Sequence, residues 1–187
     1  MSGTAIDHER ELVRILQLAH AGELAAAYAY QGHWRSRFGE RRRGEREEIQ
    51  RIEAAEWVHR NEVVDMLTAL GSGPVPWRER LMAAIGRFFG GLCFVGGRFL
   101  PMYAAGRLEA MNVGQYVDAA AHARASGHGG FGEELDEMVA EEARHEAWFS
   151  AQCRDHWLLP IASTIGRWSP AELTPEAAEL TSETATD

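Results

Sequence analysis

Two Glu-x-x-His pairs constrain the fold of this chain more than any other feature, because each lies on a helical face that should pack a core. Residues 139–149 read VAEEARHEAWF, and Glu142 and His145 share a stripe with Met138 and Phe149 at three- and four-residue spacing. Burying an unpaired carboxylate is costly. An acid and an imidazole on such a face therefore need a partner inside the protein.

A second pair and two single carboxylates complete a symmetric set. Glu56 and His59 lie on the apolar stripe of an earlier helical stretch. Glu23 points inward on the stretch before this pair, and Glu109 points inward on the stretch before Glu142. Glu23 precedes Glu56 by 33 residues, and Glu109 precedes Glu142 by the same number. This spacing predicts two helix pairs related by an approximate two-fold axis.

Helical periodicity runs through most of the chain, and strand-like alternation is absent. We expect an all-α fold, a four-helix bundle with an extra apolar, Gly-rich connecting helix between the second and third long helices. The predicted long helices span 8–36, 45–70, 102–125 and 132–157, and the connecting helix spans 77–100. The bundle domain is predicted over 1–160, followed at 161–187 by a short apolar segment and an acidic tail that we expect to be disordered.

Composition narrows the classes of function. The net charge of −9 argues against binding to nucleic acid, which needs clustered positive charge. No apolar run is long enough to predict a transmembrane helix, and the polar N-terminal stretch predicts no signal peptide. Cys93 and Cys153 are too few for a disulfide framework. We therefore expect a protein of the reducing cytoplasm, with peripheral contact at the inner face of the cell membrane left open by the apolar connecting helix.

The inward carboxylates predict a dimetal centre. Four converging carboxylates would repel one another, and the sequence contains no Lys to neutralise them. Two divalent cations would balance four negative charges, and two imidazoles would complete their coordination. The expected metal ligands are Glu23, Glu56, His59, Glu109, Glu142 and His145.

This ligand set is that of the ferritin-like carboxylate proteins, in which two helices each supply a Glu and two others each supply a Glu-x-x-His. Iron is the expected metal, with manganese as the alternative. Structural zinc sites favour Cys or several His ligands, and calcium favours oxygen ligands alone.

Several motifs of the chain resemble the demethoxyubiquinone hydroxylases of ubiquinone biosynthesis. They are the stretch AHAGELAAAYAYQG at 19–32, the order of the six ligands, the Gly-rich stretch at 85–97, and Tyr116 seven residues after Glu109. The resemblance spans residues 12–157. It implies a di-iron monooxygenase that uses O2 to hydroxylate a hydrophobic, quinone-like ring. It also implies peripheral membrane contact through the connecting helix and NADH as the source of electrons.

Other side chains are candidates for roles beside the metals. Glu141 can hold the free ring nitrogen of a histidine on another helix. Tyr116 is either a catalytic hydrogen-bond donor or an ordinary core tyrosine. His20, on the turn before Glu23, is either a partner of a ligand or a packing histidine. The quinone hydroxylase interpretation also predicts a lipophilic substrate channel or membrane face formed by Phe88, Phe89, Leu92, Phe94 and Val95.

Two other classes of function stay open at the level of sequence. A ferritin-like peroxide-reducing or iron-handling protein would use an extra carboxylate, for which Glu53 and Glu146 are the candidates. A metal-free helical interaction module would tolerate loss of Glu56 or His145 without loss of stability. The substrate, the electron donor and the oligomeric state, a homo-oligomer among the alternatives, are not determined by the sequence.

Overall fold

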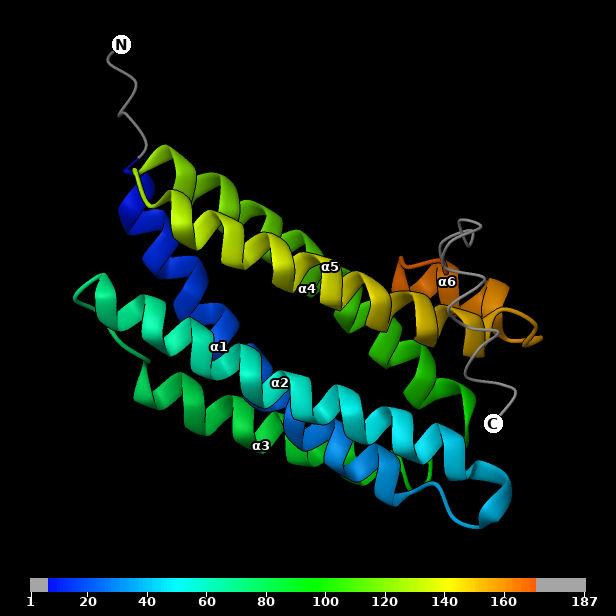
Figure 1. The fold of residues 1–187 in the computed structure, drawn as a ribbon. Coiled ribbons are helices and arrows are strands. Elements are labelled where there is room, and N and C mark those ends of the chain that lie inside the picture. The colour runs from blue at the N-terminus through cyan, green and yellow to red at the C-terminus, as the bar shows by residue number, and fades with distance from the viewer. Residues whose placement is uncertain (1–6, 171–187) are drawn as a thin grey trace.

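The computed structural model of the protein describes residues 7–170 (Figure 1). In chain order its helices are α1 (His8–Arg35), α2 (Arg43–Ala69), α3 (Pro76–Leu92), α4 (Phe99–Ala125), α5 (Gly129–Cys153) and α6 (Leu159–Gly166), with a short 3-10 helix, η1 (Glu40–Arg42), before α2. Residues 7–170 contain no β-strand. The prediction of an all-α fold is confirmed.

Sequence signals at the ends of two helices explain where these helices begin. The Asp7 side chain caps α1 by accepting a hydrogen bond from the backbone N–H of Arg10 at 3.1 Å. Pro76 lies at the start of α3, where its missing N–H costs no intrahelical hydrogen bond.

The stretch predicted as one helix over 77–100 is interrupted. α3 ends at Leu92, residues 93–98 form a turn, and α4 begins at Phe99. Gly97 has a positive φ of 68° in this turn, a conformation that glycine adopts without steric cost. The prediction of an unbroken helix was wrong because the apolar pattern continues through the turn, whereas the helical conformation of the backbone does not.

The four long helices enclose a common interior. α1 contacts α2, α3 and α4, and α4 packs along α5. Figure 1 shows α4 and α5 side by side across from α1 and α2. The interior between these two pairs of helices is where inward-pointing residues of all four can meet.

Two apolar layers fill this interior, one on each side of a polar level. The layer near the start of α1 contains Leu12, Leu16, Val63, Met66, Leu135 and Met138. The layer near the end of α1 contains Tyr30, Ile49, Ile52, Met102, Phe149 and Cys153. Each long helix crosses from one layer to the other through the segment that carries its predicted ligand. The polar level is therefore closed from water along the helix axes.

α3 lies close against α1 because small residues remove the side chains between them. A Cβ atom on Gly86 would lie 2.3 Å from the Ala25 carbonyl oxygen, and one on Gly90 would lie 2.8 Å from that of Tyr28. Larger residues at these positions would push α3 away from α1. None of the described helices is long and apolar enough to span a membrane.

The C-terminal end of the described chain folds back on α4. The Tyr103 hydroxyl donates to the carbonyl oxygens of Ala162 and Trp168, each at 2.8 Å. The Trp168 indole is buried against Gly106, where a side chain would collide with the ring. The acidic tail predicted to be disordered falls mostly in residues 171–187, which lie outside the described residues.

Candidate metal centre

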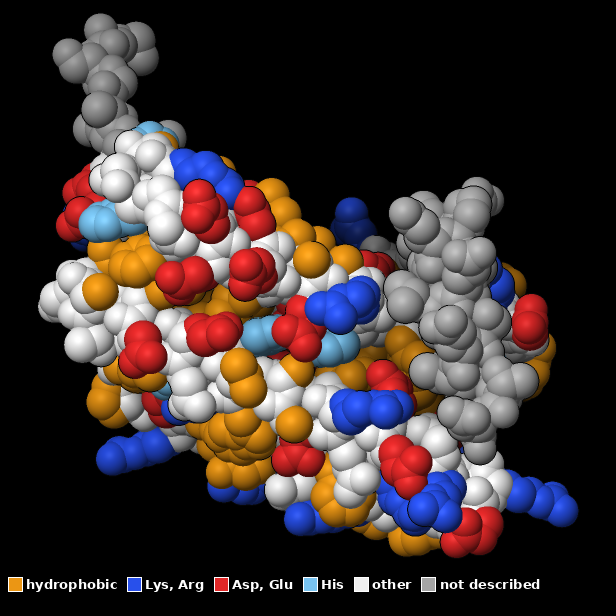
Figure 2. All heavy atoms as spheres, in the orientation of Figure 1, with side chains coloured by type: hydrophobic (Ala, Val, Ile, Leu, Met, Phe, Trp, Pro, Cys, Tyr) orange, Lys and Arg blue, Asp and Glu red, His pale blue; other side chains and the backbone are white. Residues whose placement is uncertain are grey.

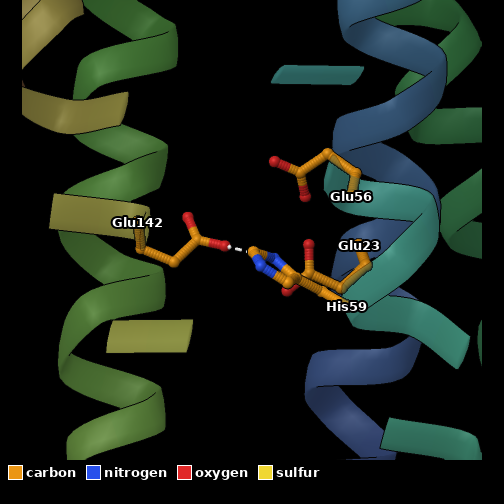
Figure 3. Close-up of side chains that lie close together, drawn as sticks. All are labelled: Glu23, Glu56, His59 and Glu142. Carbon is orange, nitrogen blue, oxygen red and sulfur yellow. Dashed lines mark ion pairs between the residues drawn. The ribbon is translucent and has the colours of Figure 1, made fainter. Parts of the chain in front are cut away.

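Four buried carboxylates converge at the polar level, one from each long helix. Glu23 lies on α1, Glu56 on α2, Glu109 on α4 and Glu142 on α5, and each is at most 1% exposed. In Figure 3, Glu142 reaches across the interior toward Glu23, Glu56 and His59. The helical periodicity explains this convergence, because each Glu occupies an inward position of its own helix.

Two overlapping groups of side chains can each hold a metal ion. The first is Glu23, Glu56, His59 and Glu142, and the second is Glu56, Glu109, Glu142 and His145. Within each group, one ligand atom per residue lies within 4.8 Å of the others. Glu56 and Glu142 belong to both groups, while the two remaining members of each group are its own. This arrangement suits two neighbouring cations bridged by two carboxylates.

The six side chains contain buried nitrogen and oxygen atoms that have no hydrogen-bond partner. Seven of their buried atoms have no hydrogen-bond partner: Glu23 Oε2, both oxygens of Glu56, His59 Nδ1, Glu109 Oε2, Glu142 Oε1 and His145 Nδ1. Buried polar atoms are normally satisfied, and bound cations would satisfy a cluster of acceptor atoms. The chemistry of this donor set, oxygen-rich with two imidazoles, fits iron or manganese.

Burial and mutual repulsion both disfavour the charged forms of the converging carboxylates. Burial raises the pKa of Glu56 well above its ordinary value, and repulsion from Glu23 and Glu142 adds to the rise. Burial likewise raises the pKa values of Glu23 and Glu109. Burial also acts to raise the pKa of Glu142, but its contacts with Glu109 and His59 lower it overall. Without a metal, the centre therefore retains protons that divalent cations would replace.

His59 lies between two consecutive carboxylates of α5. Its Nε2 is 3.2 Å from Glu141 Oε2, and its Nδ1 is 3.0 Å from Glu142 Oε1. The second contact is an ion pair, and His59 Nδ1 has no hydrogen-bond partner. Burial disfavours the charged ring, but the neighbouring carboxylates raise the pKa of His59 to about 9.

His145 occupies the matching position on α5 without a matching partner. The residue that corresponds to Glu141 on α2 is Ala55, and the Nδ1 atom of His145 is buried without a hydrogen-bond partner. The residue is half-buried, and burial lowers the pKa of its ring. The two histidine sides of the centre therefore differ, although their ligand types are the same.

Two tyrosines bind the carboxylates crosswise between α1 and α4. The Tyr116 hydroxyl on α4 donates to Glu23 Oε1 on α1, and the Tyr30 hydroxyl on α1 donates to Glu109 Oε1 on α4. Both tyrosines are fully buried. Sequence reasoning proposed Tyr116 and missed Tyr30. The signal was present, because Tyr30 follows Glu23 by seven residues, as Tyr116 follows Glu109.

Sequence reasoning also missed Asn112. Its Nδ2 donates to Glu142 Oε2 at 3.4 Å, and the side chain is buried. Asn112 lies one turn after Glu109 on the same inward stripe of α4, which is the pattern that marked the ligands themselves.

His20 faces a different set of groups from the one expected beside the metals. Its Nδ1 is 2.9 Å from Glu79 Oε1 on α3, and its carbonyl oxygen accepts a hydrogen bond from Arg60. Arg60 also binds Glu79. The described hydrogen bonds of His20 thus tie α1 to α2 and α3, because the ring points to the α3 side of α1.

The residues predicted to line a substrate channel lie on the outside of the protein. The exposed fractions are 63% for Phe88, 50% for Phe89, 41% for Leu92, 53% for Phe94 and 80% for Val95. The side of α3 that packs on α1 is formed by glycines, so these larger side chains point away from the interior. Of the two expected roles, an interior channel is not seen, and a membrane face is compatible with the exposure.

The two candidates for an extra metal ligand contact tryptophans instead. Glu53 accepts hydrogen bonds from the indole N–H groups of Trp34 at 2.6 Å and Trp57 at 3.4 Å. Glu146 accepts one from Trp168 at 2.9 Å. Neither belongs to the two groups that can hold a metal ion.

Comparisons with protein-family models, curated proteins and solved structures found no match for this chain. The chemistry of the centre itself therefore carries the assignment of function.

Proposed function

We propose that the protein is a ferritin-like four-helix-bundle oxidoreductase with a carboxylate-bridged di-iron centre, which uses O2 to hydroxylate a hydrophobic ring. The observation that carries the proposal is the overlap of two metal-capable groups in Glu56 and Glu142. A single metal site would not need two shared carboxylates, and a structural core would not contain four. The resemblance to demethoxyubiquinone hydroxylases supports a quinone-like substrate.

The six ligands would hold the two metals, with Glu56 and Glu142 shared between them. Two ferrous ions at such a centre supply electrons to activate dioxygen, and NADH is the proposed source of those electrons. Manganese is the alternative metal, because the donor set suits both. The four carboxylates match the charge of two divalent cations, which explains how the protein tolerates them without a Lys.

The surrounding residues hold the ligands in place. Glu141 would accept a hydrogen bond from His59 Nε2–H, which leaves the lone pair of Nδ1 for a metal in the centre. Tyr30 and Tyr116 each occupy one oxygen of Glu109 and Glu23, so that the other oxygen of each carboxylate is free for a metal. These contacts would hold the proposed ligands in fixed orientations around the metals.

The apolar surface of α3 and of the turn after it supports a lipophilic substrate. Phe88, Phe89, Phe94 and Val95 expose large apolar side chains on this part of the molecule. An amphipathic helix of this kind binds at a membrane interface. We propose that the protein contacts a membrane through this surface and receives its ring substrate from the lipid phase.

Metal content is the decisive experiment. Protein loaded anaerobically with ferrous iron should hold two irons per chain, and admission of air should produce new near-ultraviolet absorption. A Glu56→Ala/Glu142→Ala double variant is the control and should hold less than one. Less than one tightly bound metal in the wild-type protein would eliminate the proposal.

A further inference from the structure

The side of α3 that faces away from α1 is an apolar stripe along the whole helix. Its four exposed large side chains recur at intervals of four, seven and four residues and so share one side of the helix: Trp77, Leu81, Phe88 and Leu92. The opposite side carries the glycines that pack on α1. The described part of the chain therefore leaves the stripe open to solvent.

The turns that follow α1 and α3 extend this apolar surface. Phe38 lies in the turn after α1 and Phe94 in the turn after α3, and the centroids of their rings are 6.1 Å apart. Both rings are exposed, Phe38 at 71% and Phe94 at 53%. We call the stripe and these two turns together the α3 face.

Arginines border the α3 face. Arg80 and Arg87, seven residues apart, lie along one edge of the stripe, and Arg78 lies at the other edge. The stretch 35–46, which contains Phe38, has six Arg and two Glu. Figure 2 shows basic side chains along the lower edge of the molecule, where α3 and the start of α2 lie in Figure 1.

Three of these arginines have no carboxylate partner. Arg41, Arg80 and Arg87 are exposed, and none of them forms an ion pair within residues 7–170. The Arg87 guanidinium lies 3.9 Å from the centroid of the Tyr28 ring, a contact that leaves its charge without a counter-ion. By contrast, α5 contains seven acidic residues and one Arg. A protein with a net charge of −9 thus presents unpaired positive charge at the border of an apolar surface.

We propose that the α3 face docks on a bilayer of anionic phospholipid, with its apolar stripe among the acyl chains and its arginines on the lipid phosphates. This inference rests on the membrane contact proposed above and adds the class of lipid that is bound. Helices with Trp, Phe and Leu on one side and basic residues beside them bind at membrane interfaces, and anionic lipids strengthen the binding.

The charge distribution favours this partner over a second copy of the chain. A two-fold interface through the α3 face would bring the same arginines of both copies together, which is a repulsive arrangement. Figure 1 shows α3 and α5 on opposite sides of α1, so a molecule docked through α3 keeps the acidic α5 away from the anionic lipid.

Sedimentation of the full-length chain with two kinds of vesicle tests the proposal. One kind is phosphatidylcholine alone, and the other is equal parts of phosphatidylcholine and phosphatidylglycerol. We expect wild type to bind the anionic vesicles about 10- to 100-fold more tightly than the neutral ones, and NaCl to reduce this difference. The R41Q/R80Q/R87Q variant, which we call the rim variant, should lose most of this preference and bind neutral vesicles as wild type does.

The matched control is R10Q/R14Q/R124Q, which removes three positive charges near the start of α1 and the end of α4. It should bind both kinds of vesicle as wild type does, and circular dichroism should show the wild-type helix content in both variants. Equal binding of wild type to the two kinds of vesicle, or equal binding of the rim variant and this control to anionic vesicles, would overturn the lipid selectivity and leave the membrane contact standing. Failure of wild type to bind either kind of vesicle would overturn both.

Discussion

His59 on α2 and Glu141 on α5 are in contact at the edge of the candidate metal centre, with Nε2 and Oε2 3.2 Å apart. In the proposed centre this contact would orient a metal ligand, because it favours the proton on the ring nitrogen that faces Glu141. We expect Glu141→Ala to weaken metal binding about 10- to 100-fold. Chelator competition measures the affinity.

The conservative variant separates positioning from charge. In Glu141→Gln the amide oxygen still accepts a hydrogen bond from His59 Nε2. The metal affinity of this variant should therefore be close to that of wild type. If Glu141→Ala binds metal as tightly as wild type, the positioning role of Glu141 is wrong.

Removal of a shared ligand should have opposite effects with and without metal. Glu56→Ala relieves repulsion among buried carboxylates, so the metal-free variant should melt at or above the temperature of metal-free wild type. Metal at 100 times its Kd adds about 2.7 kcal/mol to the native state, and this gain should disappear in the variant. Calorimetry with and without Mn²⁺ measures both effects. Equal stabilisation of variant and wild type by Mn²⁺ would contradict the role of Glu56 as a ligand, and no stabilisation of either would favour the metal-free interaction module.

The stability of the metal-free protein should fall as pH rises from 6.5 to 9. The pKa of His59 is raised from 6.5 to about 9, so its stabilising contribution is present below pH 6.5 and is lost as pH approaches 9. The raised pKa values of Glu56 and Glu109 act in the same direction, because their protonated forms are lost as pH rises. Urea unfolding at the two pH values measures the change.

This window avoids an opposing contribution from His33. Burial lowers the pKa of His33 to about 3, so its effect appears below pH 6.5, where stability falls with decreasing pH. Saturating Mn²⁺ should flatten the dependence between pH 6.5 and 9. A metal-free protein that is as stable at pH 9 as at pH 6.5 would contradict the expected coupling.

The two crosswise tyrosines should behave alike. Tyr30→Phe and Tyr116→Phe each leave a buried carboxylate oxygen without its donor, which costs about 1–3 kcal/mol. Denaturant unfolding of the metal-free protein measures the loss. Tyr28→Phe is the control, because the Tyr28 ring packs against Arg87 and Trp57 outside the centre. A large loss of unfolding free energy for one variant and none for the other would contradict this expectation. It would show that the two tyrosine–carboxylate hydrogen bonds do not contribute equally.

The exposed face of α3 should bind lipid and quinone independently of the metals. Phe88→Ser/Phe89→Ser should reduce sedimentation with phospholipid vesicles and weaken binding of quinone-like ligands, while iron content stays at the wild-type level. Ile161→Ser/Ile165→Ser on α6 is the matched control, since it removes two exposed apolar side chains elsewhere. Unchanged vesicle and quinone binding in the α3 variant would remove the support for a membrane-derived substrate.

The sequence by itself determined the helices and the inward positions, because the period of an α-helix decides which side of each segment is apolar. The same period placed Glu23, Glu56, Glu109 and Glu142 on the apolar sides of their helices. The 33-residue spacing related Glu23 to Glu56 in the same way as Glu109 to Glu142. It did not reveal the break at residues 93–98, because apolar composition alone does not report a change of backbone direction.

Only the tertiary structure decided which inward residues face one another. Tyr30 and Tyr116 reach across to each other's helix, and His20 turns toward Glu79 on α3. Period fixes the side of a helix on which a residue lies, but the neighbour that it meets depends on how helices pack. The glycine contacts of α3 likewise turned its large apolar residues outward, a choice between two apolar sides that depends on close approach to α1.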